Sequence, residues 1–166
     1  GNVTAVAVEG TFDDCQRLVK AAFADAALQA RVRLSSANSI SLGRLLPQVL
    51  YHAYASLQYA VNTPLTLSVP SGNFGNLVAG VIAWRLGAPI THFSAPTTIN
   101  DTVPRYLATG HVEARPSVRT VANAMDVGDP SNLERLRWLF GHDVVAMRKM
   151  VTSRAYSDDE ARAAIR

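Results

Sequence analysis

Residues 69–76 read VPSGNFGN and separate two apolar patterns in a chain of 166 residues. The run before them, residues 65–69, is typical of a short strand, and an apolar helical pattern begins at Leu77. The two glycines give the connecting backbone unusual freedom, and the first turn of a helix leaves backbone N–H groups without partners. A glycine loop in this place can bind an anion such as phosphate, or it can be an ordinary tight connection.

A second strand follows the helix. The helical pattern continues to about residue 86 and ends at Gly87, with Pro89 just beyond, where helices commonly stop. Residues 89–95 then form another apolar and β-branched run. The succession of strand, loop, helix and strand over residues 65–95 predicts a βαβ unit, whose two strands pair in parallel.

Capping residues and apolar periodicity predict the remaining elements. Strands are expected over residues 3–8 and 31–34, and a long helix over about 40–57, with Pro47 in its first turn or at a kink. Further helices are expected after Thr11, from Asn100 to Thr109, over 133–140 and 144–151, and from Ser157 onward. The fold class that follows is α/β with a parallel βαβ core.

The loop lacks the spacing of the common nucleotide-binding motifs. No Gly-Lys-Ser/Thr is present, so it is not a Walker A loop, and residues 72–75 do not fit G-x-G-x-x-G. Ser71 could donate its hydroxyl to an anion, Asn73 and Asn76 could donate amide hydrogens, and Asn76 could instead cap the helix. The histidines have no metal-ligand spacing, and there is no Gly-x-Ser-x-Gly elbow, so neither a metal site nor a serine hydrolase is predicted.

Composition and charge argue against several classes of function. The chain is 48% hydrophobic and 17% charged, and no apolar run is long enough to span a bilayer, so no membrane partner is expected. The N-terminus lacks the features of a signal peptide, and the single cysteine, Cys15, fits a reducing compartment, so a cytoplasmic location is predicted. The net charge is +3, but the basic residues form no dense tract, which argues against a nucleic-acid partner.

Four motifs, in order along the chain, resemble those of the threonine synthase family, whose members use pyridoxal phosphate. VPSGNFGN resembles the cofactor-phosphate loop of that family. EGTFDDCQ, residues 9–16, is similar to its upstream strand-to-helix segment, and SANSISLGRLLPQ, residues 36–48, is similar to the start of its Asn-Ser-Ile-Asn helix. NDTVPR, residues 100–105, is similar to the segment after its next strand, so the resemblance extends over nearly the whole chain.

The resemblance implies a carbon–oxygen lyase that converts O-phospho-L-homoserine and water to L-threonine and phosphate, with pyridoxal phosphate as the electron sink. The residues that it implies as ligands of the cofactor phosphate are Ser71, Gly72, Asn73, Phe74, Gly75 and Asn76. Asn100, Asp101 and Arg105 follow a predicted strand whose carboxyl end would point toward the ligand crevice, so they could face the substrate phosphate. Asn100 or Asp101 could instead cap the helix that begins there.

The fold that the resemblance implies is the three-layer αβα arrangement of fold-type II pyridoxal-phosphate enzymes, present here in incomplete form. Residues 1–35 are expected to be the tail of the smaller domain, as a β-α step, and residues 36–166 part of the larger, cofactor-binding domain. The lysine that holds the cofactor as a Schiff base in the family is expected upstream, because neither Lys20 nor Lys149 lies in the family's Pro-Thr…Phe-Lys-Asp context. The chain is therefore expected to be a central segment of a longer enzyme and inactive by itself.

Two alternatives remain open at this point. One is another fold-type II pyridoxal-phosphate enzyme, such as a dehydratase. The other is a non-catalytic domain that binds a phosphorylated metabolite, which the missing lysine alone favours. Nothing in the sequence indicates the oligomeric state.

Overall fold

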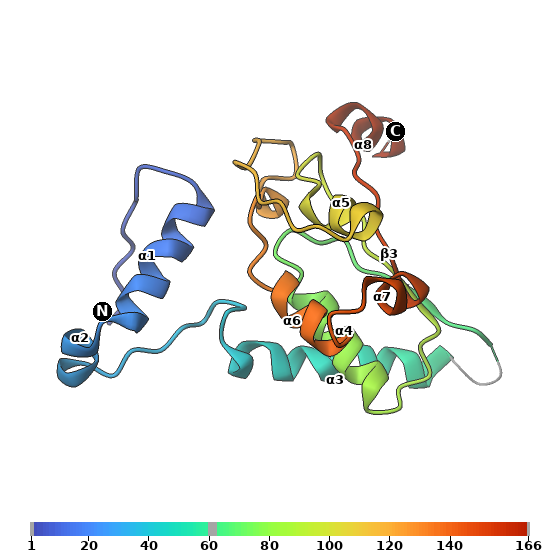
Figure 1. The fold of residues 1–166 in the computed structure, drawn as a ribbon, viewed down its shortest axis with the longest axis horizontal. Helices are drawn as coiled ribbons and strands as arrows, with labels where there is room; N and C mark the ends of the chain where they lie inside the picture. Colours follow the sequence, from blue (N-terminus) through green and yellow to red (C-terminus); the bar gives the residue numbers. More distant parts are fainter. Residues whose placement is uncertain (1, 60–62, 166) are drawn as a thin grey trace. The chain divides into compact units, whose positions relative to one another are not determined.

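A computed structural model describes residues 2–59 and 63–165 of the chain (Figure 1). The chain divides into two compact units, Gly1–Ser35 and Ser36–Arg166, and the candidate loop belongs to the second. The assignment of these units to the smaller and larger domains of a pyridoxal-phosphate enzyme stays a prediction.

The first unit contains two helices, α1 (Phe12–Ala24) and α2 (Ala26–Arg31). As the sequence predicts, Thr11 caps α1: its hydroxyl accepts a hydrogen bond from the backbone N of Asp14 (3.3 Å), and the Asp14 carboxylate accepts one from the backbone N of Thr11 (2.9 Å). This reciprocal pair is a capping box.

The strands expected over residues 3–8 and 31–34 are wrong. Residues 2–8 have no strand pairing in the structure, and Arg31 ends α2. β-Branched residues favour extended backbone, but a strand also needs a hydrogen-bonded neighbour. None of the described residues pairs with this segment, and Val3 and Val6 are 85% and 77% exposed. The expected β-α step at the start of the chain is therefore a coil followed by a helix.

The second unit is built on a parallel sheet of three short strands in the order β1-β2-β3. The strands are β1 (Thr66–Ser68), β2 (His92–Ser94) and β3 (Val151–Thr152). β1 and β2 pair in parallel with Leu67 opposite Phe93, on either side of helix α4 (Gly75–Arg85), which confirms the βαβ unit. β3 lies where the sequence predicts only the end of a helix; it pairs with β2, with Val151 opposite Phe93.

Helix α4 lies at the centre of this unit. Seven of its eleven residues are buried, because it packs against both α3 (Leu42–Tyr59) and α6 (Leu133–Leu139). An α-helix that is apolar on all sides is expected to be enclosed in this way. Gly80 permits the close approach, since a Cβ there would lie 2.7 Å from the Phe93 ring and 3.1 Å from His52.

The other elements agree with the predicted helices apart from their exact ends. They are α5 (Thr102–Thr109), α7 (Val144–Met150) and α8 (Asp158–Ile165). The 3₁₀ turn η1 (Asn123–Met125) was not predicted from the sequence. α5 packs on α7, which also contacts β2. Gly110 ends α5 with φ +80°, and Ser157 and Glu160 form the expected capping box of α8. The three-layer arrangement expected for the complete family fold stays a prediction.

Helix α3 has one buried and one exposed apolar face. Leu45, Val49 and His52 are buried against the core, whereas the outward positions 42, 46, 50, 54 and 57 are all apolar and between 57% and 70% exposed. Pro47 lies in the second turn of this helix rather than in the first. No helix in the described part of the chain is long and apolar enough to cross a membrane.

Candidate anion-binding site

The candidate loop joins the carboxyl end of β1 to the first turn of α4. In the described structure, no group accepts a hydrogen bond from the backbone N–H of any residue from Gly72 to Leu77; the first amide of α4 with a partner is that of Val78, bonded to Phe74 O (3.0 Å). The first turn of α4 also contains no acidic residue. Six backbone donors and the positive end of a buried helix dipole therefore lie in one short segment, which is the chemistry of an anion site.

Ser71 fixes the start of the loop. Its backbone N donates to Pro96 O (2.9 Å), and its hydroxyl donates to Val69 O (2.7 Å). The side chain is buried. The single hydroxyl hydrogen is thus committed to the end of the strand, so a bond to an anion would have to replace it.

Asn73 is held at every polar atom of its side chain. Nδ2 donates to Ser39 Oγ (2.7 Å), while Oδ1 accepts from both the backbone N (2.8 Å) and the hydroxyl (3.0 Å) of Ser131. These partners come from the segment before α3 and from the segment before α6. The side chain therefore ties the loop to two distant parts of the chain, instead of reaching toward a ligand as the sequence suggested.

Two glycines of the loop lie against neighbouring atoms. A Cβ at Gly72 would be 2.7 Å from Cα of Met125, and one at Gly75 would be 2.8 Å from Cβ of Ser39. Real Cβ atoms essentially never make such short contacts. Both glycines are needed for this packing, which keeps the loop close to its supports.

Phe74 is the N-cap residue of α4 and has a left-handed backbone, with φ +60° and ψ +11°. Its ring is buried. A non-glycine residue in this conformation is strained and persists only where its surroundings determine it. A left-handed residue next to right-handed ones also turns successive N–H groups toward one concave point, which is a backbone arrangement that binds anions.

Asn76 does not cap the helix. Its Nδ2 donates to Gln48 Oε1 (3.1 Å), and its Oδ1 and backbone O lie 3.2 and 3.0 Å from Nε2 of His52. Burial lowers the pKa of His52, so the neutral imidazole is favoured and Nε2–H donates to Asn76. The side chain of Asn76 thus contacts α3, and only its backbone N–H is available at the helix terminus.

Asn100, Asp101 and Arg105 lie at the start of α5. Asn100 is engaged with the 118–126 segment: Nδ2 donates to Val118 O (2.9 Å) and Asp126 Oδ1 (3.1 Å), and Oδ1 accepts from the backbone N of Val118 (2.7 Å). These bonds suit a structural role. Asp101 is the N-cap of α5 and makes no side-chain capping bond.

Arg105 forms an ion pair with Glu113 through Nη2. Its other terminal nitrogen, Nη1, is buried and has no acceptor within the described structure. A buried guanidinium nitrogen without an acceptor is costly, and a ligand oxygen would satisfy it.

The contacts that hold the loop come from residues that the sequence did not single out. Ser39, Ser131 and Asn132 form hydrogen bonds with Asn73. Arg135 in turn donates a hydrogen bond of 2.6 Å to Asn132. Ser39 lies within the motif of residues 36–48, and the signal for the others was the polar stretch DPSN, residues 129–132, just before the apolar helix α6. Sequence spacing cannot show that it meets a loop almost sixty residues earlier.

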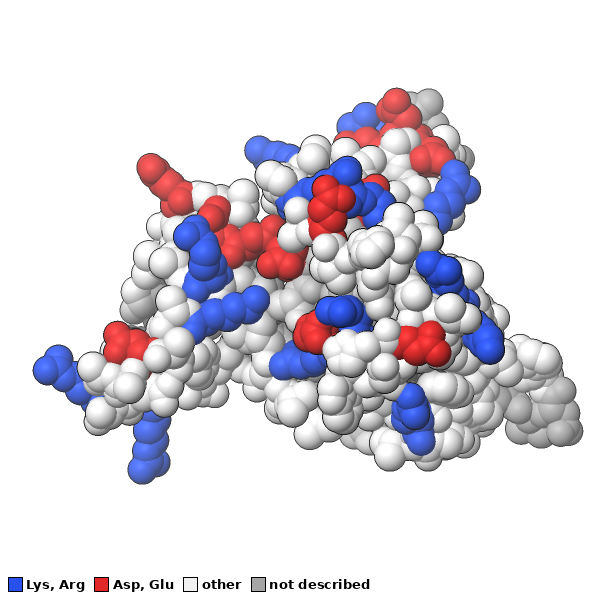
Figure 2. Space-filling model, viewed as in Figure 1, with Lys and Arg blue, Asp and Glu red and all other residues white. Residues whose placement is uncertain are grey.

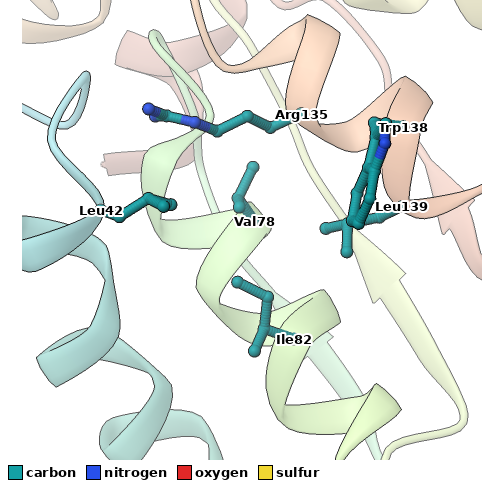
Figure 3. A pocket seen from close by; sticks show the side chains of 6 residues that line it. All are labelled: Leu42, Val78, Ile82, Arg135, Trp138 and Leu139. Atoms are coloured by element: carbon teal, nitrogen blue, oxygen red, sulfur yellow. The ribbon is translucent and has the colours of Figure 1, made fainter.

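An apolar pocket of about 240 Å³ adjoins this polar cluster at Arg135. Leu42, Val78, Ile82, Arg135, Trp138 and Leu139 line it. Figure 3 shows the Arg135 side chain extending from α6 across the start of α4, with its guanidinium group pointing away from Trp138. None of the loop residues 71–76 lines this pocket, so it is not the anion site.

Both lysines lie on exposed surfaces outside the loop, Lys20 on α1 and Lys149 on α7. On the visible face of the second unit, basic and acidic side chains are interspersed (Figure 2). No group of three or more potential metal ligands occurs among the residues that the structure describes.

Comparison with known proteins points to one enzyme family. No protein-family model matches the chain. Curated threonine synthases from Serratia marcescens and Haemophilus influenzae are both 46% identical to it, over 90% and 98% of this chain. The chain matches a segment of the threonine synthases. It spans only 35% and 40% of the length of these two relatives.

Solved threonine synthase structures have the same fold over this segment. The crystal structure of the Escherichia coli threonine synthase superimposes with a TM-score of 0.93 at 42% identity, covering 100% of this chain and 39% of that one. The pyridoxal-phosphate-bound threonine synthase from Brucella melitensis gives a TM-score of 0.83 at 34% identity, covering 98% and 40%. The predicted α/β class and the resemblance of the four motifs to those of threonine synthases are therefore confirmed.

Proposed function

We propose that this chain supplies the cofactor-phosphate site of a threonine synthase, which converts O-phospho-L-homoserine and water to L-threonine and phosphate in the cytoplasm. The observation that carries the proposal is the row of six backbone amides from Gly72 to Leu77, at the start of a buried helix, that have no acceptor among the described residues. The similarity to a threonine synthase that is itself pyridoxal-phosphate-bound supports the choice of cofactor.

The residues present fit a phosphate dianion. The backbone amides of the loop would donate to its oxygens, and the α4 dipole would add a favourable potential. Gly72 and Gly75 let the loop lie close to its supports. Pyridoxal phosphate supplies an electron sink for the chemistry at the substrate carbons, and the part of this chain is to bind and orient its phosphate.

The residues predicted to bind the cofactor phosphate would do so in two different ways. Gly72, Asn73, Phe74, Gly75 and Asn76 would contribute backbone N–H groups. Ser71 would contribute mainly by fixing the start of the loop, because its backbone N and its hydroxyl already bind the chain itself.

Arg105 remains the proposed side-chain contact of the substrate phosphate, and its Nη1, which has no acceptor among the described residues, supports this role. Asp101 could contribute only its backbone N–H, because its carboxylate cannot donate a hydrogen bond and would repel the phosphate. Asn100 would act indirectly by holding the 118–126 segment. Lys20 and Lys149 are exposed and lie outside the loop, which supports the proposal that the chain alone does not turn over substrate.

The test is a titration of the purified chain, followed by ¹H–¹⁵N NMR, with pyridoxal phosphate, inorganic phosphate and AMP in separate samples. We expect pyridoxal phosphate and inorganic phosphate to shift the amides of residues 72–77, while those of exposed α8 stay unchanged. Shifts with AMP alone would favour a nucleotide-binding domain instead, and no response of the loop to any probe would contradict the proposal.

A second assay addresses catalysis. O-Phospho-L-homoserine is incubated with the chain and pyridoxal phosphate, and released phosphate is measured. We expect no release above the rate with cofactor alone. Sustained phosphate release accompanied by threonine would contradict the proposed inactivity of the chain on its own. It would leave the proposed binding site unaffected.

A further inference from the structure

Asn132 is not part of the loop but forms a hydrogen bond with it, and Asn132 is completely buried. Its Nδ2 donates one hydrogen bond to the backbone O of Asn73 (3.0 Å) and one to Ser39 Oγ (3.0 Å). Its Oδ1 accepts from Nη1 of Arg135 (2.6 Å). Both amide hydrogens are therefore used.

Arg135 determines which way the Asn132 amide faces. A guanidinium group can only donate, so the atom of Asn132 beside Arg135 must be the oxygen, and the NH₂ group must face the loop. Arg135 is itself held, because Nη1 also donates to Ser39 O (2.5 Å) and Nη2 donates to Ile40 O. The orientation of Asn132 is thus determined by the segment before α3.

A bond to the Asn73 carbonyl has a direct consequence for the next amide. The peptide unit is planar and trans, so the C=O of Asn73 and the N–H of Phe74 point in opposite directions. Holding the carbonyl toward Asn132 turns the N–H of Phe74 away from it, and this N–H has no acceptor in the described structure.

The same bond supports the strained residue that follows. Phe74 has φ +60°, which costs about 1–3 kcal/mol for a non-glycine residue. Rotation of the 73–74 peptide is the natural way to relieve this strain, and the rotation would leave the buried NH₂ group of Asn132 short of an acceptor. Leaving this buried NH₂ group without its acceptor costs a similar free energy, so the hydrogen bond from Asn132 can offset the backbone strain at Phe74.

We propose that Asn132 is a positioning residue of the anion site, which holds the Asn73 carbonyl and thereby directs the Phe74 amide and those after it toward the bound phosphate. The inference rests on the proposed function for its ligand. Its structural part concerns the backbone of Phe74 alone and can be tested without any ligand.

The test uses Asn132→Leu, which has a similar size but no hydrogen-bonding group, and Leu136→Val as the matched control. Leu136 is a completely buried residue of α6, the helix that Asn132 precedes as N-cap, and its side chain has no hydrogen-bonding group that could contact the loop. Inorganic phosphate and pyridoxal phosphate are titrated into each protein by NMR. The three-bond HN–Hα coupling and chemical shifts of Phe74 are also measured in the ligand-free proteins.

We expect Asn132→Leu to remain folded, to lose the left-handed signature of Phe74, and to bind both probes at least about tenfold more weakly, the equivalent of one bond of about 1.4 kcal/mol. Leu136→Val should keep the Phe74 signature and bind within about twofold of the parent chain. If Asn132→Leu does not fold, Ser39→Ala removes the shared acceptor of Asn73 and Asn132 and should weaken binding in the same direction.

Two results would overturn the inference: an unchanged Phe74 backbone with unchanged affinity in the variant that folds, or an equal loss of affinity in Leu136→Val. If the parent chain binds neither probe, the proposed function fails. The coupling of Phe74 in the ligand-free variants still decides the role of Asn132 in that case.

Discussion

Gly72 offers a quantitative test of the loop, because its replacement by alanine adds one methyl group at a defined place. A Cβ there would lie 2.7 Å from Cα of Met125 and 2.9 Å from its carbonyl oxygen. Both atoms belong to the backbone, so they cannot turn aside as the end of a side chain would. The loop and η1 would have to separate by about 0.7 Å to reach the 3.4 Å at which ordinary contact begins.

The energetic cost follows from two opposing terms. Inserting a methyl group into a packed site typically costs about 1–3 kcal/mol. The backbone of Gly72 is not in the left-handed region, so alanine also gains about 0.4–1 kcal/mol from a less flexible unfolded chain. Taken at the middle of the two ranges, Gly72→Ala should therefore lower the free energy of unfolding by about 1.3 kcal/mol, and by no more than about 2.6 kcal/mol.

Urea unfolding followed by tryptophan fluorescence measures this quantity for the second unit, since Trp84 and Trp138 both belong to it. Gly43→Ala is the matched control. Gly43 lies in α3, and a Cβ there would meet only Ser41 Oγ at 3.6 Å, so alanine should stabilise the helix by up to about 1 kcal/mol. The two substitutions should have opposite signs. An equal or greater stability of Gly72→Ala would refute the packing argument, and loss of stability in Gly43→Ala would refute the use of the control.

Three further predictions concern the support of the fold. Val81→Ala, at a completely buried position of α4, should cost about 2 kcal/mol in urea unfolding, whereas Val121→Ala, 51% exposed, should cost little; equal losses would contradict the assigned core. Burial lowers the pKa of His52 in the folded chain below its ordinary 6.5. On acidification the unfolded chain therefore binds a proton at His52 before the folded chain does, and the free energy of unfolding should fall as the pH drops from 7 to 5. That fall should be smaller in His52→Gln but unchanged in the exposed control His111→Gln, and an equal slope in all three proteins would exclude the effect. Thr11→Ala should cost α1 about 1 kcal/mol, seen as reduced helical Cα shifts at its first turn, and unchanged shifts would show that the capping box contributes nothing.

Local chemistry was enough to predict most of the elements. The βαβ unit was predictable because strand, glycine loop and helix each have a local signature, and a short crossover leaves parallel pairing as the natural outcome. The capping boxes at Thr11 and Ser157 were predictable for the same reason, since both partners lie within four residues. The strand expected over residues 3–8 failed because β-branched residues indicate extended backbone, while pairing depends on a neighbour that the local sequence does not contain.

The sequence by itself determined where an anion could bind, through the glycines and the helix that begins at the loop. Only the tertiary structure decided which atoms of that segment are available. The side chains of Ser71, Asn73 and Asn76 bind the protein itself, which leaves the backbone amides as donors. Their direction depends on Asn132, which is 59 residues from Asn73 in the chain. Contacts at such separations arise only when the chain folds, because they depend on the packing of whole helices and not on local spacing.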